Sequence, residues 1–283
     1  LLPELRARGH DVVVLTRHPR AGRDEVRWEP ARGELDPRAL DGVAAAIHLA
    51  GENVGQRWTA ARRRRILDSR VEGTALLART LAGLRPRPGV LVSVSALGYY
   101  GNGGDRELDE WSPSGDGFLA DVVRRWEAAA EPARQAGIRV VHPRLGVVLG
   151  SGGGALARLL PVFRFCLGGR LGSGRQWMSW IAREDAVRAL TFLLEAPLEG
   201  TVNVVAPEPV RNATFTRTLA RVLHRPAPWV VPAFVLELLY GRMARETLLW
   251  GQRVRCRRLC DAGFTFVHPT LDGALRAAIR PGG

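Results

Sequence analysis

Polar side chains that could do chemistry follow two apolar segments of this sequence. Thr16 and Arg17 come at the end of the apolar segment 11–16, and an arginine placed there can hold a phosphate through its planar guanidinium. Tyr99 and Tyr100 lie in SALGYYG, directly after a second apolar segment, and their hydroxyls are candidate proton donors. The sequence therefore suggests a phosphate-bearing ligand and groups able to exchange a proton.

Two residue counts limit the chemistry. All 41 basic residues are arginine, so the chain has no lysine for a Schiff base, for a phosphate-binding P-loop or for a Tyr-x-x-x-Lys pair. The three cysteines, Cys166, Cys256 and Cys260, show no paired-ligand pattern. This argues against a disulfide framework or a structural zinc site, and it favours a reducing compartment such as the cytoplasm.

The 28 acidic residues leave a formal net charge of +13, which favours anionic partners. Arginines cluster at 62–65 and 124–125 on predicted helices, where charges usually form a solvated face, and no zinc-finger or helix-turn-helix signature accompanies them. We therefore expect a phosphate-bearing small molecule and no specific nucleic acid. No membrane association is expected either, because the apolar stretch 229–240 is shorter than a bilayer span and contains Pro232 and Glu237.

Alternating apolar strands and amphipathic helices predict an α/β fold with a Rossmann-type, doubly wound parallel sheet. Strands are expected at 11–16, 43–49, 90–95, 138–141, 146–149 and 201–205. Helices are expected at 1–8, 58–84, 118–133, 155–167, 185–196, 215–223, 234–250 and 271–279. We expect residues 1–150 to form a nucleotide-binding domain and residues 151–283 a smaller, mostly helical substrate lobe, with about 176–206 returning to the sheet.

The sequence opens inside the first helix of that pattern. A doubly wound nucleotide-binding sheet begins with a central strand and a glycine-rich turn before this helix, and neither is present ahead of Leu1. A truncated N-terminus is one interpretation, and a fold that never had this strand is the alternative. For a truncated chain we expect an open gap or exposed edges beside the strand at 11–16.

Several long blocks carry a resemblance to a known family. They are HLAGENVGQRW (48–58), SALGYYG (95–101), PRLGVVLGSGGGAL (143–156), LGGRLGSGRQWMSWI (167–181) and NVVAPEPVRNATF (203–215). Over essentially the whole chain they resemble the atypical extended short-chain dehydrogenases/reductases of the epimerase family group, which are relatives of sugar-nucleotide epimerases. The resemblance implies a nicotinamide cofactor and a small-molecule substrate that the sequence does not identify.

Arg17 and the resemblance together imply NADP(H) as the cofactor. In NAD-binding sheets an acidic residue at this place binds the ribose hydroxyls, whereas an arginine accommodates a 2′-phosphate. Thr16 and Arg17 therefore predict NADPH over NADH. The other positions that we assign to the cofactor are Leu49, Ala50, Gly51, Arg70, Arg144 and Val148.

The same resemblance bears on catalysis. In active short-chain reductases a serine polarises the substrate, a tyrosine exchanges the proton, and a lysine four residues later lowers the pKa of that tyrosine. By this resemblance Ser95 fits the first role. Phe118 and Val122 stand where the tyrosine and the lysine are expected, so Tyr99 and Tyr100 remain as the candidate proton donors.

Two functions stay open at this point. One is an NADP(H)-dependent oxidoreductase or epimerase, in which an arginine such as Arg144 lowers the pKa of a nearby phenol. The alternative is an NADPH-binding protein with little catalysis, such as a sensor or a scaffold linked to division. Of the histidines, His48 is expected in the core, and His142 is an alternative cleft-facing residue.

Overall fold

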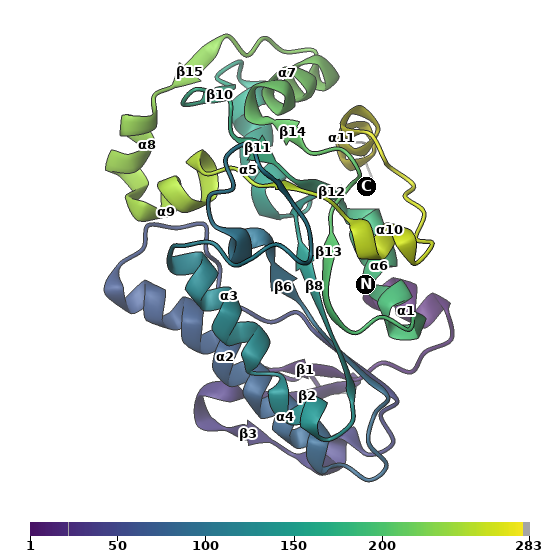
Figure 1. Cartoon of the computed structure of the whole chain (residues 1–283). Coiled ribbons are helices and arrows are strands. Elements are labelled where there is room, and N and C mark those ends of the chain that lie inside the picture. Colours follow the sequence, from purple (N-terminus) through teal and green to yellow (C-terminus); the bar gives the residue numbers. More distant parts are fainter. Residues whose placement is uncertain (22, 280–283) are drawn as a thin grey trace.

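The computed structural model describes residues 1–21 and 23–279, and a parallel sheet runs through its centre (Figure 1). Its main strands are, in spatial order, β13 (Gly200–Val204), β8 (Arg139–Leu145), β5 (Val90–Ser93) and β4 (Ala45–His48). The two-residue strand β6 (Ser95–Ala96) pairs with the end of β8. All of these pairs are parallel, so the strands end at the same edge of the sheet.

Helices cover both faces of this sheet. One face carries α2 (Ala60–Gly83), α3 (Phe118–Ala128) and α4 (Glu131–Gln135), and the other carries α1 (Leu2–Ala7) and α6 (Arg183–Glu195). Every residue of β5 is buried, because a parallel strand between two helical layers meets apolar side chains on both sides. The predicted α/β architecture is confirmed.

The helix predicted over 118–133 is divided into two. The chain leaves the helical path after α3, and Pro132 stands in the first turn of α4. A proline has no N–H to continue the hydrogen bonds of a preceding helix, but it is well tolerated in a first turn. The prediction of one continuous helix was therefore wrong here.

The first strands form a sheet of their own beside the central one. β1 (Val14–Thr16) pairs in parallel with β2 (Glu25–Glu29), which pairs antiparallel with β3 (Glu34–Leu35). The 3₁₀ turns η1 (Pro30–Arg32) and η2 (Pro37–Leu40) follow β2 and β3. In the described part of the chain no strand pairing joins β1 to β4, so each of these strands has one edge without a strand partner, as expected for exposed edges beside the first strand.

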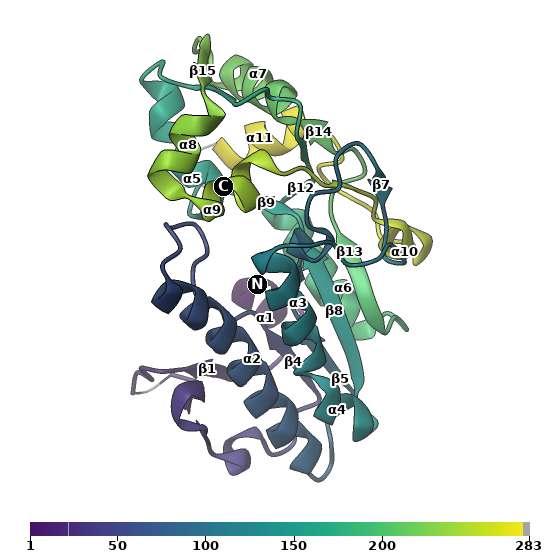
Figure 2. The same ribbon diagram turned by 60° about the vertical axis from the view of Figure 1, so that its left-hand side comes forward.

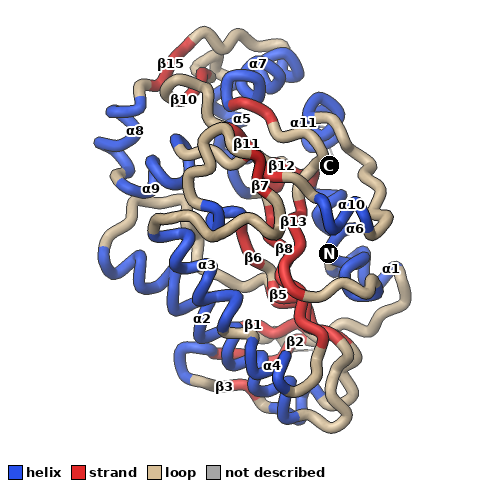
Figure 3. The backbone as a smooth tube through the Cα atoms, in the orientation of Figure 1, coloured by secondary structure: helices blue, strands red, loops and turns tan. Residues whose placement is uncertain are grey.

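A second, mostly helical lobe lies above the carboxyl ends of the central strands (Figure 2). Its helices include α5 (Gly154–Arg164), α7 (Asn212–Leu223) and α11 (Leu271–Ile279). Short strand pairs lie among them, β10 (Gly169–Leu171) with β15 (Trp229–Val231) and β11 (Trp177–Met178) with β14 (Val210–Arg211) (Figure 3). The lobe has a core of its own, in which Leu156, Trp180, Leu219 and Leu275 are fully buried.

The helix predicted over 234–250 is also interrupted. It consists of α8 (Ala233–Tyr240), α9 (Arg242–Ala244) and the π-helical turn η4 (Arg245–Leu249). The interruption falls at Gly241, whose φ of 61° belongs to the left-handed region that glycine adopts readily. This turn places η4 against the N-terminus of α3, as described below.

Segments from the two parts of the chain pair with each other. β12 (Trp180–Ala182) pairs with β9 (Val147–Leu149), and β13 pairs with β8. β16 (Arg253–Val254), which precedes the short helix α10 (Arg257–Asp261), pairs with β7 (Glu107–Leu108). The lobe is thus joined to the central sheet by backbone pairing at several points.

Candidate functional site

The carboxyl ends of β1 and β4 carry five of the predicted cofactor residues. Thr16 ends β1 and Arg17 follows it as an exposed side chain, with no carboxylate paired to it in the part of the chain that the structure describes. After β4, Leu49 and Gly51 are exposed and Ala50 is half-buried. Because open α/β sheets bind ligands outside the carboxyl ends of their strands, these residues can contact one.

Arg70 lies directly against the turn after β4. Its Nη1 donates hydrogen bonds to the carbonyl oxygens of Glu52 (3.0 Å) and Ile66 (3.1 Å), and its guanidinium lies 5.0 Å from the ring centre of Trp126. A Cβ atom on Gly51 would stand only 3.0 Å from Cζ of Arg70. The structure therefore brings two predicted residues, Gly51 and Arg70, into contact, and Arg70 fixes the β4 turn to α2.

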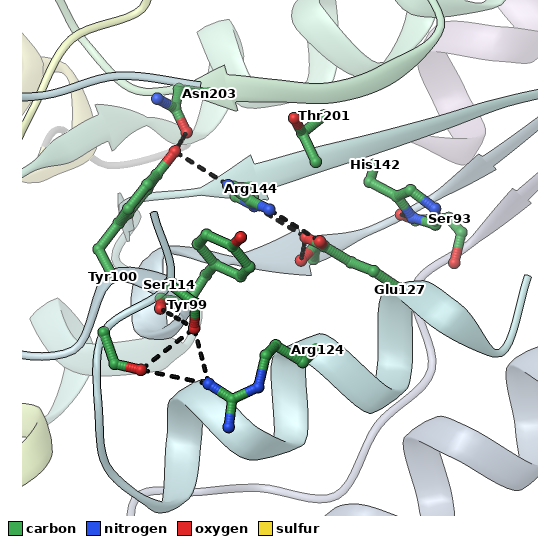
Figure 4. A network of polar contacts seen from close by, with 12 residues as sticks. Ser93, Tyr99, Tyr100, Ser114, Arg124, Glu127, His142, Arg144, Thr201 and Asn203 are labelled. Carbon is green, nitrogen blue, oxygen red and sulfur yellow. Dashed lines mark hydrogen bonds and ion pairs between the residues drawn. The ribbon is translucent and has the colours of Figure 1, made fainter. Parts of the chain in front are cut away.

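A buried ion pair lies under the carboxyl end of β8 (Figure 4). Nε and Nη2 of Arg144 donate to Oε1 and Oε2 of Glu127, each at 2.8 Å, which is the two-point geometry of a guanidinium on a carboxylate. The Oγ of Ser95 donates to the same Oε1 at 2.6 Å. Ser95 and Arg144 are both only 2% exposed, so these three hydrogen bonds to Glu127 lie inside the protein.

The two adjacent tyrosines have different surroundings. Tyr100 is buried, and its hydroxyl donates to Oδ1 of Asn203 (2.8 Å) and accepts from Nη1 of Arg144 (3.1 Å). Burial raises the pKa of Tyr100 to about 12, because desolvation of a phenolate outweighs the attraction of Arg144. Arg144 itself acts to lower the pKa of this phenol, as predicted, but the opposite effect of burial is larger. Tyr99 is only half-buried, and Cζ of Arg144 lies 3.4 Å from its ring centre (Figure 4).

Glu127 was not among the residues that the sequence singled out, although a signal was present. It lies four residues after Val123 and seven after Ala120, so helical periodicity places all three on one face of α3. Ala120 and Val123 are buried, and a carboxylate on such a face needs a buried cation. The two arginines of the same helix, Arg124 and Arg125, are exposed and pair with Asp121, so the cation for Glu127 comes from the sheet instead.

The two histidines of the sheet pack inside the protein. The ring of His48 meets that of Trp28 edge-on at 5.5 Å between centres, and burial lowers the pKa of His48 to about 4. Nδ1 of His142 lies 3.3 Å from the carbonyl oxygen of Ser93, and burial lowers the pKa of His142 as well. The predicted core position of His48 is confirmed, and His142 has its contact within the sheet.

Val148, the remaining predicted cofactor residue, lies in β9 and is half-buried, opposite Ile181 of β12. Within residues 1–21 and 23–279, no group of three or more His, Cys, Asp or Glu side chains is placed to hold a metal ion. In the same residues, none of the helices combines the length and the apolar character needed to cross a bilayer.

Comparison with known proteins assigns the chain to a family. The model of the NAD-dependent epimerase/dehydratase family matches residues 1–206. The chain belongs to this family. A second model, described as a domain of unknown function (DUF1731), matches residues 231–278, which hold α8, α9 and α10 and most of α11.

Individual members of the epimerase family are similar over nearly the whole chain. Epimerase family protein Mb2239 of Mycobacterium bovis is 45% identical over 285 residues, which cover 100% of this chain and 94% of that protein. The crystal structure of human epimerase family protein SDR39U1 (isoform 2) with NADPH is 36% identical, with a TM-score of 0.87 over 98% of this chain and 93% of that one. A nucleoside-diphosphate sugar epimerase from Corynebacterium glutamicum is 33% identical with a TM-score of 0.79, covering 97% of this chain and 54% of that one.

This member of the epimerase family has apolar side chains at the two positions expected for the Tyr-x-x-x-Lys pair. Phe118 packs against Trp58 with 4.9 Å between ring centres, and Val122 is 1% exposed. The backbone N–H groups of Phe118 and Leu119 donate to the two carboxylate oxygens of Glu246 in η4, at 3.1 and 2.9 Å. A carboxylate from the C-terminal lobe thus satisfies the N-terminus of α3.

Removal of Arg144 tests the buried ion pair. Arg144→Ala leaves the Glu127 carboxylate buried without a cation, so we expect a loss of about 3–5 kcal/mol in the free energy of unfolding measured with urea. The control is Arg134→Ala, which breaks an exposed pair with Glu131 and should cost at most about 1 kcal/mol. An equal loss of unfolding free energy in the two variants would contradict the larger stabilising contribution of the buried pair.

His48 predicts a pH dependence of stability. The unfolded chain binds a proton at this histidine below about pH 6.5, whereas the folded chain does so only below about pH 4, so acidification between these values favours unfolding. His48→Leu should flatten the fall in unfolding free energy over this interval. The exposed His10→Leu is the control, and an unchanged slope in His48→Leu would contradict the assignment.

Proposed function

We propose that this protein binds NADP(H) and acts as an oxidoreductase or epimerase on a small molecule that carries a carbonyl or sugar group. The observation that supports this most directly is the exposed Arg17 at the carboxyl end of β1, where a 2′-phosphate would lie. The human relative whose crystal structure contains NADPH supports the same cofactor. A phosphate-bearing small molecule also suits the positive net charge without any nucleic acid.

The residues present fit this cofactor. Arg17 and Thr16 would hold the 2′-phosphate, and the exposed Leu49 and Gly51 after β4 would contact a flat ring, with the guanidinium of Arg70 packed directly against Gly51. Val148 would line the nicotinamide end. When bound, the nicotinamide supplies reversible hydride exchange with a carbon of the substrate.

Tyr99 is the proposed proton donor. It is the less buried of the two adjacent tyrosines, and the cation of Arg144 lies against its ring, where it would stabilise a developing phenolate. In this proposal Ser95 and Tyr100 are positioning residues, because their hydroxyls hold Glu127 and Arg144 in place.

A second function is favoured by a specific observation. The phenol of Tyr100 is buried and the usual tyrosine and lysine positions hold Phe118 and Val122, which is what a protein that binds NADP(H) with little turnover would show. We place the cofactor domain at residues 1–150 and the substrate lobe at 151–283 under either function, with about 176–206 returning to the sheet. For both we propose a cytoplasmic location.

Cofactor binding is tested by titration of the protein with NADPH and with NADH, followed by tryptophan fluorescence. Arg17→Ala should weaken NADPH binding roughly 10- to 100-fold, because one charge-assisted contact to phosphate contributes about 1.5–3 kcal/mol, and it should leave NADH binding nearly unchanged. Arg79→Ala removes the same charge from an exposed site on α2 and is the control. If Arg17→Ala binds NADPH as tightly as the unaltered protein does, the proposed role of Arg17 is wrong.

Turnover separates the two functions. NADPH oxidation is followed with a panel of aldehydes, ketones and nucleotide sugars, and Tyr99→Phe should lower the rate by about 10²- to 10⁴-fold, as expected for loss of a general acid. Tyr240→Phe, on the exposed surface of α8, is the matched control. Tight NADPH binding without turnover on any compound would instead favour the binding protein.

A further inference from the structure

Cys256 and Cys260 lie one helical turn apart, Cys256 as the N-cap of α10 and Cys260 as its fourth residue. The backbone N–H of Cys260 donates to the carbonyl oxygen of Cys256 at 3.0 Å, so the two side chains leave the helix on the same face. Their Sγ atoms are 2.7 Å apart. A disulfide bond needs a separation of about 2.0 Å, so a small movement of the two side chains would bring the sulfurs to bonding distance.

The two thiols differ in access and in acidity. Cys260 is exposed, whereas Cys256 is 4% exposed and packs with the main apolar core. The hydrogen bond from Cys256 lowers the pKa of Cys260, and this bond together with burial raises the pKa of Cys256. Cys260 therefore has the character of an attacking thiolate, and Cys256 that of a thiol which reacts afterwards.

The charges around the pair come from several elements. Arg257 and Arg258 stand between the two cysteines in the chain, and Asp261 follows Cys260. Glu110, from the loop after β7, accepts a hydrogen bond from the backbone N–H of Arg258 at 3.2 Å. The guanidinium of Arg257 pairs with Asp109 and that of Arg258 with the carbonyl oxygens of Glu199 and Thr201, so the charges that act on Cys260 are Asp261 and Glu110.

We propose that Cys256 and Cys260 form a reversible disulfide bond, with hydrogen peroxide as the oxidant. The thiolate of Cys260 attacks one peroxide oxygen, the O–O bond breaks, and hydroxide leaves and takes a proton to become water. The sulfur of Cys256 then attacks the resulting sulfenic acid, an S–S bond forms, and a second water leaves with the proton of Cys256. The two thiols lose two electrons to hydrogen peroxide, and a dithiol such as dithiothreitol returns them by exchange.

This site borders the network described above. The Oε1 of Glu110 that accepts from the backbone N–H of Arg258 also accepts from the backbone N–H of Asn203, at 3.0 Å. The side-chain Oδ1 of Asn203 in turn accepts a hydrogen bond from the hydroxyl of Tyr100. α10 and β13 therefore share one buried carboxylate. The proposed redox site uses none of the cofactor residues, and so it does not depend on the proposed function.

The experiment is a peptide map of the full chain after brief treatment with stoichiometric hydrogen peroxide. Trypsin cleaves after Arg257 and Arg258, between the two cysteines, so a disulfide joins peptide 256–257 to peptide 259–276. We expect this linked pair, with two hydrogens fewer than the sum of the free peptides, and its disappearance after dithiothreitol. The number of thiols that react with iodoacetamide should fall from three to one in the unfolded, unreduced protein.

Three variants separate this site from general thiol oxidation. Cys166→Ser should keep the linked peptides, and Cys260→Ser should lose them. Cys256→Ser should accumulate a sulfenic acid at Cys260 that dimedone traps, because no second thiol is present to resolve it. Absence of the linked pair from the peroxide-treated protein, or recovery of Cys260 only in disulfide-linked dimers, would overturn the proposal.

Discussion

The pairing of Arg144 with Glu127 constrains the groups around it. Neither charge can stay buried without the other, and the pair joins the end of β8 to the last turn of α3. The hydroxyl of Ser95 donates a further hydrogen bond to Oε1 of Glu127, and the hydroxyl of Tyr100 accepts one from Nη1 of Arg144. The hydroxyls of Ser95 and Tyr100, from β6 and the turn that follows it, are thereby held in the interior, whereas Tyr99 is only half-buried.

A second constraint fixes the helix that carries Glu127. The N-terminus of α3 is satisfied by Glu246 from the C-terminal lobe, and Arg242 pairs with the same carboxylate. Gly117 makes this approach feasible, because a Cβ atom there would stand 2.8 Å from the ring of Trp250. The position of α3 on the sheet is therefore set at both ends, by the C-terminal lobe at its first turn and by β8 at its last turn.

The sequence predicted what depends on local pattern. Apolar runs such as 90–95 marked parallel strands, and the place of Arg17 after the first strand followed from the same reasoning. The surroundings of Tyr100 were beyond this reasoning, because its hydrogen-bond partners Arg144 and Asn203 are 44 and 103 residues away in the chain. Glu246 is 128 residues from Phe118, and the local sequence of neither segment indicates their contact. Breaks at Gly241 and before Pro132 had local signals, but periodic apolar residues on both sides concealed them.

The packing of Val122 has a consequence for how this protein could change. A tyrosine at position 118 would find room, because Phe118 is only half-buried, so that half of the usual pair is open to a single substitution. A lysine at position 122 would place an ammonium group where 1% of the present side chain meets solvent, at a cost of several kcal/mol without a partner. The tyrosine alone would lack the cation that makes it a useful base. A stepwise introduction of the common catalytic pair would thus pass through a single variant with either lower stability or no gain in activity.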